Sequence, residues 1–94
     1  MQNILRKTWK ISDILKNFSN ENKLAILCYL WEEEKNVSDI MKCSKISQSQ
    51  ISQYLGKMKL EWILDSKKEW KEVYYKIKDK KVLELISSLK KIFN

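Results

Sequence analysis

Apolar side chains recur along the chain at helical spacing, and the pattern begins with two helices. The first is predicted over residues 4–18, where apolar side chains form a broad stripe along one face. Ser19 or Asn20 can cap a second helix, which continues through "ENKLAILCYLWEEE". Because residues 24–31 are apolar on nearly all sides, this helix is expected at the centre of the fold, covered by several neighbours.

A short helix is predicted next, after the charged break "EEEKN". Ser38 is a suitable N-cap, and Asp39 places an acidic side chain in the first turn, where it complements the helix dipole. The predicted helix covers Asp39–Ser44, and its apolar side chains Ile40 and Met41 are expected to face the interior.

A fourth helix is predicted over residues 47–60. Ser47 and Gln50 form the S-x-x-Q pattern of a capping box, which satisfies free backbone N–H groups of the first turn. Apolar residues at helical spacing then mark one face, and they are Ile51, Leu55, Met58 and Trp62. A short helix, a tight turn and a second helix are typical of a helix-turn-helix unit.

The period of the pattern changes after the fourth helix. Val73, Tyr75 and Ile77 alternate with other residues as in a strand, so the segment 63–78 is predicted to be a two-stranded hairpin with a basic tip. Asp79 can cap a last helix, whose apolar stripe comprises Val82, Leu85, Ile86, Leu89, Ile92 and Phe93. The predicted fold class is therefore mainly α (α+β), a winged helix-turn-helix in the order α-α-α-α-β-β-α.

Composition adds constraints on partners and compartment. The chain has 94 residues, which suits a single domain over residues 1–94. The net charge of +7 favours an anionic partner, nucleic acid first, although a lysine-rich surface can also serve solubility alone. No apolar run approaches the ~20 residues of a membrane span, and neither end resembles a signal peptide. A cytoplasmic protein is expected, in which Cys28 and Cys43 are free thiols.

The outer face of helix 47–60 combines neutral polar side chains with basic ones, a pattern expected of sequence-specific DNA binding. Gln can bond bidentately to adenine in the major groove, and Ser can donate or accept, whereas lysines at the helix end and in the hairpin can contact phosphate. The residues predicted to bind double-stranded DNA are Ser47, Gln48, Ser49, Gln50, Ser52, Gln53, Tyr54, Lys57, Lys59, Lys67, Lys68 and Lys71. A solvated face without a partner could have the same composition.

Two segments carry a family resemblance. The stretches "NENKLAILCYL" and "NVSDIMKCSKISQSQISQYLGKMKLEWILDSKKEWKEVYYKI" resemble the ArsR/SmtB family of small winged-helix repressors, over residues 19–93. The resemblance implies a homodimer formed by the first and last helices, an operator with twofold character, and repression relieved by an inducer. The residue pattern agrees on the dimer, because a chain of this length can hardly bury two apolar-striped terminal helices within itself. Both stripes packing onto the central helix is the alternative.

The metal sites of that family are not matched by this chain. The family's thiolate site on the short helix resembles "ELCVCDL", whereas the matching stretch here is "NVSDIM". Its other site pairs Asp with His on the last helix, and this chain has no His. We therefore expect neither a metal ion nor another cofactor.

The stretch "AILCYL" is similar to a thiol- or persulfide-responsive branch of the family, related to haemolysin-gene activators. In that branch this cysteine pairs with a second one near the C-terminus. Cys28 matches the first position, but Asn94 stands where the second cysteine would fall. Cys28 is thus either a thiol sensor or a small residue of the core, and Cys43 could be its partner only if the fold brings them together.

Two tryptophans stand where the resemblance implies glycine. Trp62 follows the fourth helix, where the chain of these proteins reverses in a left-handed conformation, and Trp70 lies in the hairpin. We expect Trp62 to extend the apolar face and pack into the core, and Trp70 to be exposed. At the hairpin tip the Trp70 ring could lean on a sugar or phosphate of DNA or make a protein contact, and the sequence favours neither.

The sequence thus predicts a dimeric transcriptional regulator, a repressor that reads operator DNA with helix 47–60 and contacts its backbone with the hairpin 63–78. One alternative is a winged-helix module for protein–protein assembly, and another is a plasmid- or phage-type protein for DNA architecture or replication control. An enzyme is not expected, because the chain has no His, no Gly-rich phosphate loop and no recognisable pair of nucleophile and base.

Overall fold

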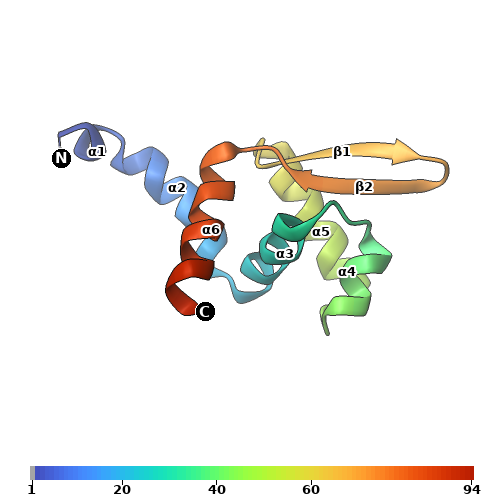
Figure 1. The fold of residues 1–94 in the computed structure, drawn as a ribbon. Coiled ribbons are helices and arrows are strands. Elements are labelled where there is room, and N and C mark those ends of the chain that lie inside the picture. The colour runs from blue at the N-terminus through green and yellow to red at the C-terminus, as the bar shows by residue number, and fades with distance from the viewer. Residues whose placement is uncertain (1) are drawn as a thin grey trace.

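The structure is a computed structural model that describes residues 2–94, and this part of the chain forms helices and one antiparallel hairpin, which extends to one side of them (Figure 1). In chain order the elements are α1 (Gln2–Arg6), α2 (Thr8–Ser19), α3 (Glu21–Glu32), α4 (Val37–Cys43), α5 (Gln48–Leu60), β1 (Leu64–Glu69), β2 (Glu72–Ile77) and α6 (Lys80–Phe93). This order confirms the predicted winged helix-turn-helix and its mainly helical class. It differs from the prediction in one respect, because the first predicted helix is divided into α1 and α2.

The division between α1 and α2 lies at Lys7. The backbone N–H of Lys7 donates to the carbonyl oxygen of Ile4 at 3.0 Å and closes a tight turn. The hydroxyl of Thr8, the first residue of α2, then donates to the carbonyl oxygen of Leu5 at 3.1 Å. The prediction of one continuous helix over residues 4–18 is therefore wrong, since the apolar spacing continues across a turn that it does not reveal.

Helix α3 lies at the centre of the fold, as its apolar sequence predicts. The side chain of Asn20 caps it by accepting a hydrogen bond of 3.0 Å from the backbone N–H of Lys23. Its buried residues pack in one cluster with those of α4, α5, the hairpin and α6, and this core comprises Ile26, Leu27, Leu30, Ile40, Ile51, Leu55, Met58, Ile63, Leu64, Ile77, Val82 and Ile86. Each fully buried side chain of this kind contributes about 1.5–3 kcal/mol, so the core fixes α5 and the hairpin relative to α3.

Helix α4 begins earlier than predicted because Asn36, and not Ser38, is its N-cap. The side chain of Asn36 accepts from the backbone N–H of Asp39 at 2.8 Å, and the Asp39 carboxylate accepts from the backbone N–H of Asn36 at 3.2 Å. These reciprocal bonds form a complete capping box. Ile40 is buried as predicted, but Met41 is 41% exposed, so the prediction that Met41 faces the interior is wrong.

The hairpin predicted over residues 63–78 is confirmed, and it is attached to the segment between α3 and α4. Its strands pair in register up to Glu69 opposite Glu72. In the attached segment, Lys35 exchanges backbone hydrogen bonds of 3.1 and 2.8 Å with Tyr75 of β2. The side-chain amide of Asn36 also donates to the Glu72 carboxylate at 3.2 Å. The middle of β2 and its first residue are therefore held against the segment that leads into α4.

The last helix, α6, is capped by Asp79 as predicted. Val82 and Ile86 are buried, whereas Ile92 and Phe93 near its end are exposed. The predicted apolar stripe is real, but within one chain only its first half is covered. Among residues 2–94, no helix has both the length and the apolar character needed to cross a membrane.

Candidate nucleic-acid interface

Burial of its apolar face fixes the rotation of helix α5 about its own axis, and a side-chain cap fixes the residue at which the helix begins. Ile51, Leu55 and Met58 are completely buried against the core. The hydroxyl of Ser47 accepts from the backbone N–H of Gln50 at 3.3 Å, which confirms the predicted N-cap. Because one face of α5 is buried along its length, its opposite face is presented to solvent.

The exposed face of α5 carries the side chains that the sequence singled out as readers of DNA. Exposed residues in its first turns are Ser47, Gln48, Ser49, Gln50, Ser52 and Gln53. The Ser47 hydroxyl also lies 3.3 Å from that of Ser49 and 3.4 Å from Oε1 of Gln50. Ser47, Ser49 and Gln50 are thus engaged at the cap. The other three, Gln48, Ser52 and Gln53, project into solvent with their donors and acceptors available.

The far end of α5 is basic, and α3 contributes to it. Lys57 and Lys59 are exposed, and Tyr54 is half-buried. Nζ of Lys23, at the start of α3, lies 5.7 Å from the centroid of the Tyr54 ring. Partial burial lowers the pKa of Lys23, and the nearby charge of Lys57 lowers it further. Lys23 was not among the predicted DNA contacts, because it lies on α3 and approaches α5 only in the folded chain.

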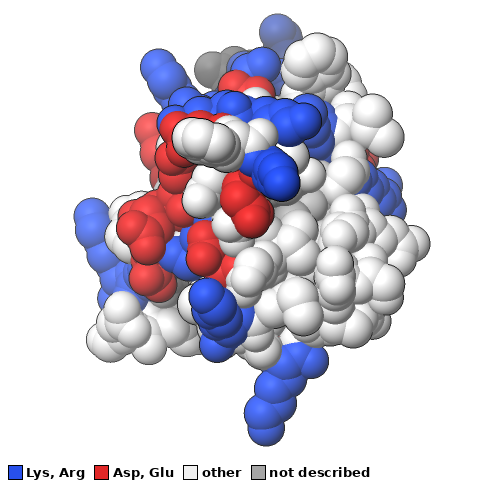
Figure 2. Space-filling model, turned by 90° about the vertical axis from the view of Figure 1, so that its right-hand side faces the viewer, with Lys and Arg blue, Asp and Glu red and all other residues white. Residues whose placement is uncertain are grey.

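The hairpin lysines fall into two groups. Nζ of Lys67 lies 3.3 Å from carboxylate oxygens of both Glu34 and Glu69. Hydrogen bonds to these two carboxylates, Glu69 first, raise the pKa of Lys67. Lys68 and Lys71 are exposed and extend toward solvent near the tip. Figure 2, which faces the hairpin side of the molecule, shows acidic side chains gathered on one half of this face and a broad uncharged area on the other.

The two tryptophans at the implied glycine positions both have left-handed backbones. The φ angle is 65° at Trp62 and 59° at Trp70, and these are the non-glycine residues of the described chain with positive φ. Trp62 is 73% exposed, so the prediction that it packs into the core is wrong. Helix α5 ends at Leu60, and the reversal of the chain turns the Trp62 ring outward, where Nζ of Lys78 lies 4.9 Å from its centroid. Trp70 is exposed as expected.

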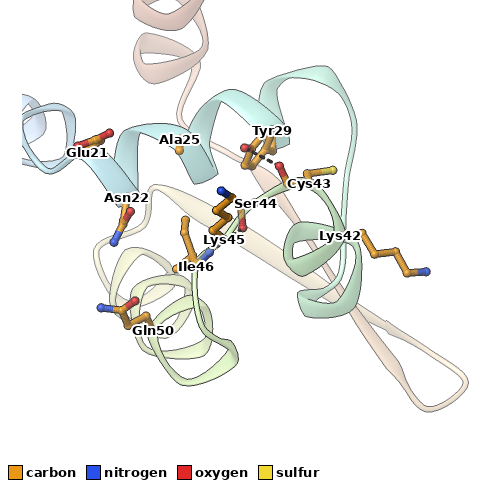
Figure 3. A pocket seen from close by; sticks show the side chains of 10 residues that line it. All are labelled: Glu21, Asn22, Ala25, Tyr29, Lys42, Cys43, Ser44, Lys45, Ile46 and Gln50. Carbon is orange, nitrogen blue, oxygen red and sulfur yellow. Dashed lines mark hydrogen bonds between the residues drawn. The ribbon is translucent and has the colours of Figure 1, made fainter.

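A depression of about 570 Å³ lies between α3, the end of α4 and the start of α5 (Figure 3). The hydroxyl of Tyr29, on α3, donates to the carbonyl oxygen of Cys43 at 2.9 Å across this depression. The hydroxyl of Ser44 accepts from the backbone N–H of Ile46 at 3.3 Å in the turn before α5. These bonds hold the turn of the helix-turn-helix in place, so they position the first residues of α5.

Both cysteines are free thiols, as predicted. Cys28 is half-buried on α3, and Cys43 is exposed at the end of α4. Burial raises the pKa of the Cys28 thiol, while the positive charge of Lys90 acts in the opposite direction. Within residues 2–94, no group of three or more His, Cys, Asp or Glu side chains is placed to hold a metal ion.

Comparison with known proteins identifies the family. The sequence pattern described as "Bacterial regulatory protein, arsR family" matches residues 20–61, which span α3, α4 and α5. The regulator YgaV of Escherichia coli, named an HTH-type transcriptional regulator, is 30% identical over 85% of this chain and 82% of its own length. The chain belongs to the ArsR family of bacterial regulatory proteins. The predicted family resemblance is thereby confirmed.

Other ArsR-type relatives match over almost the whole chain. The transcriptional activator HlyU of Vibrio cholerae is 28% identical over 99% of this chain and 86% of its own length. The crystal structure of the transcriptional repressor BigR from Xylella fastidiosa superposes with a TM-score of 0.91 at 25% identity, covering 99% of this chain and 95% of that one. Transcription regulation is common to these relatives, and the fold agrees from end to end.

Proposed function

We propose that the protein is a dimeric transcriptional repressor that binds double-stranded operator DNA. Helix α5 lies in the major groove on this proposal, and the hairpin contacts the phosphate backbone. The observation that carries it is the exposed face of α5, with neutral hydrogen-bonding side chains in the first turns and lysines at the end. A helix of this length spans about 20 Å, which suits a major groove about 12 Å wide.

The separation of neutral and basic side chains assigns different roles to them. Gln48, Ser52 and Gln53 are proposed to read base edges, because their amides and hydroxyls are exposed and match donors and acceptors in the major groove. Lys57 and Lys59, together with Lys23 near Lys57, are proposed to contact phosphate, which positions the helix without reading sequence. Tyr54, Ser47, Ser49 and Gln50 border this surface.

In the hairpin, Lys68 and Lys71 are the proposed primary phosphate contacts. Lys67 belongs to the same basic segment, but its ammonium group is engaged by two carboxylates. A phosphate contact by Lys67 therefore requires it to leave Glu34 and Glu69, so we assign it the smaller contribution.

The terminal helices support the proposed dimer. Large apolar side chains of α1, α2 and α6 are exposed, and they include Ile4, Leu5, Trp9, Leu15, Ile92 and Phe93. A hollow of about 400 Å³ between α2 and α6 is lined mostly by apolar residues, among them Ile11, Ile14 and Leu85. A second copy packed on these helices would remove this surface from water, and a twofold dimer would place two α5 helices about 34 Å apart on DNA.

The remaining parts of the proposal follow from the DNA partner. Residues 1–94 act as one DNA-binding domain in the cytoplasm, without a catalytic step and without a metal or organic cofactor. The branch of the family that contains both activators and repressors leaves the direction of regulation to experiment. Repression is proposed because a small protein with α5 on an operator blocks access of other proteins to that DNA.

The test begins with selection of tightly bound duplexes from a random library, followed by affinity measurements on selected and scrambled duplexes at several salt concentrations. Affinity for the selected duplex should exceed that for the scrambled one by at least about a thousandfold and fall steeply with salt. Equal affinity for every duplex would favour a DNA-architectural protein, and no binding at all would favour an assembly module.

Variants then separate the two proposed roles. Replacing Gln53 by Ala should weaken binding to the selected duplex by about 1–3 kcal/mol and relax the base preference at one position. Replacing Lys68 by Ala should weaken all duplexes alike and reduce the slope of log affinity against log salt by about 1. If both variants lose affinity uniformly for all duplexes, α5 does not read sequence.

A further inference from the structure

The loop at the tip of the hairpin contains a strained residue. Glu69 of β1 pairs with Glu72 of β2, so the loop has two residues, Trp70 and Lys71. Of these two, Trp70 alone has a positive φ, 59°, which is the pattern of a type II′ turn. Glycine is the usual residue at this position, because a side chain there is crowded by the backbone. A bulky tryptophan in that conformation is a true outlier.

Contacts within the chain do not compensate for this strain. Trp70 is 95% exposed, so almost none of its ring packs on the protein. Trp62 differs, since its ring has Lys78 beside it at 4.9 Å. Figure 1 shows the hairpin extending away from the helices, with its loop at the far end of the molecule. An exposed aromatic ring held at the end of such an extension is placed to contact another molecule.

The charges near the tip indicate which kind of molecule Trp70 is placed to contact. The carboxylates of the two neighbouring acidic residues are turned back onto the protein. Glu69 binds Nζ of Lys67 at 3.3 Å, and Glu72 accepts from the amide of Asn36 at 3.2 Å. The neighbouring Lys68 and Lys71 are exposed. The tip therefore offers an apolar ring between two cationic groups, which complements a polyanion that also has an apolar surface.

We propose that Trp70 makes an apolar contact with DNA. Its indole packs against deoxyribose in the minor groove beside the major groove that α5 occupies. This inference rests on the proposed DNA binding. Strands of six residues extend for about 20 Å, more than the roughly 12 Å width of the major groove, so the tip can pass the phosphates at its edge. Apolar side chains are known to enter the minor groove, and the sugars that line it are present at every sequence.

The test uses substitutions that separate the ring from the backbone conformation. Trp70→Gly removes both the ring and the strain, Trp70→Asn removes the ring with a residue that tolerates positive φ, and Trp70→Tyr keeps an aromatic ring. The Gly variant should unfold at a higher temperature than the wild type and yet bind DNA about tenfold more weakly. The Asn variant should lose affinity similarly, and the Tyr variant should retain most of it.

Hydroxyl-radical cleavage of the bound duplex provides the direct measurement, because the radical attacks sugars in the minor groove. The wild type and the Tyr variant should protect a short run of sugars that the Gly variant leaves open to cleavage. Unchanged affinity in the Gly and Asn variants, or lower affinity with unchanged protection, would overturn the proposal. A Gly variant with a smaller mass in solution than the wild type would also overturn it, because Trp70 would then be a contact between protein chains.

The selected and the scrambled duplex distinguish this inference from the proposed function. A sugar contact reads no base edge, so the Gly variant should lose affinity on both duplexes. If the wild type shows no sequence preference but the Gly variant still binds more weakly, sequence-specific repression fails while the Trp70 contact stands. If the wild type prefers the selected duplex and the Gly variant binds equally well, only the Trp70 contact fails.

Discussion

Trp62 illustrates how one residue can combine an unfavourable backbone conformation with a favourable side-chain contact. Its left-handed backbone ends α5 and lets β1 turn back along the core. For a non-glycine residue this conformation costs about 1–2 kcal/mol. The contact of Lys78 with the ring contributes about 0.5–1 kcal/mol at an exposed site, so it offsets only part of that cost.

Substitutions at Trp62 can reveal this strain. Trp62→Ala loses the contact with Lys78 and keeps the strain, whereas Trp62→Gly loses both. The Gly variant should therefore be more stable than the Ala variant by about 1 kcal/mol, measured as the free energy of unfolding in urea. At exposed Lys59, inside α5, the order should be reversed, because Ala favours a helix over Gly by about the same amount. An Ala variant at least as stable as the Gly variant at position 62 would contradict the left-handed conformation.

The two thiols should react at different rates. Burial raises the pKa of Cys28, so its reactive thiolate is scarcer at neutral pH than that of an ordinary thiol, whereas Cys43 is exposed. Iodoacetamide at pH 7 should label Cys43 first, as measured by mass spectrometry, and labelling of Cys28 should increase as the pH rises through its raised pKa. The Cys43→Ser variant should retain only the slow reaction. Faster labelling of Cys28 would support a sensor at that position.

At the scale of elements, the segment between α3 and α4 serves two of them at once. Asn36 caps α4 through its side-chain oxygen and contacts the hairpin through its side-chain nitrogen. Lys67 adds an ion pair from the hairpin to Glu34 in the same segment. The position of the hairpin and the start of α4 therefore depend on the same few residues.

Removal of this cap provides an element-scale prediction. Asn36→Ala should lower the free energy of unfolding by about 1–2 kcal/mol, because a helix cap and a partly buried hydrogen bond are lost together. Ser38→Ala is the matched control. Ser38 is exposed inside α4, so its replacement should change stability by less than about 0.5 kcal/mol. Chemical denaturation measures the free energy of unfolding of both variants. A larger loss for Ser38→Ala than for Asn36→Ala would show that Ser38 is the N-cap of α4.

The elements also show what the sequence can predict. Ser47 and Asp79 were identifiable as caps, and Asn20 as one of two candidates with Ser19, because a cap depends on residues within one turn. Asn36 was missed because Ser38 is an equally suitable residue nearby, and the choice depends on the hairpin, which is distant in sequence. Met41 was predicted to face the interior because it is apolar, but it lies about 100° around the helix from the buried Ile40 and so faces solvent.

The candidate interface also has features that the sequence predicts and features that it does not. The outward face of α5 was predictable because burial of Ile51, Leu55 and Met58 determines which side chains project. The engagement of Lys67 by Glu34 and the approach of Lys23 to Tyr54 were not, since each joins elements that only the folded chain brings together. Trp62 was misplaced because its spacing continues the apolar pattern of α5 beyond the end of the helix.

At the scale of the whole molecule, the exposed apolar ends of α2 and α6 predict association. Phe93 is 80% exposed, so its replacement by Asp should scarcely disturb one chain but should place a charge within the proposed dimer interface. Sedimentation of Phe93→Asp should give the mass of one chain at concentrations where the wild type gives two. Leu60→Asp, at an exposed apolar residue of α5, is the control and should leave the wild-type mass unchanged. A wild-type protein that sediments as one chain would refute the dimer.

The backbone bridge between Lys35 and Tyr75 has a consequence for the DNA itself. Since the hairpin is tied to the helices on which α5 packs, the distance between the two groove contacts is set by the protein and cannot adjust to each duplex. A duplex must therefore match this distance through its own groove width and bending. Base pairs that no side chain touches would then influence affinity through their stiffness, so A-tracts and flexible TA steps between the two contacts should be distinguished by the protein.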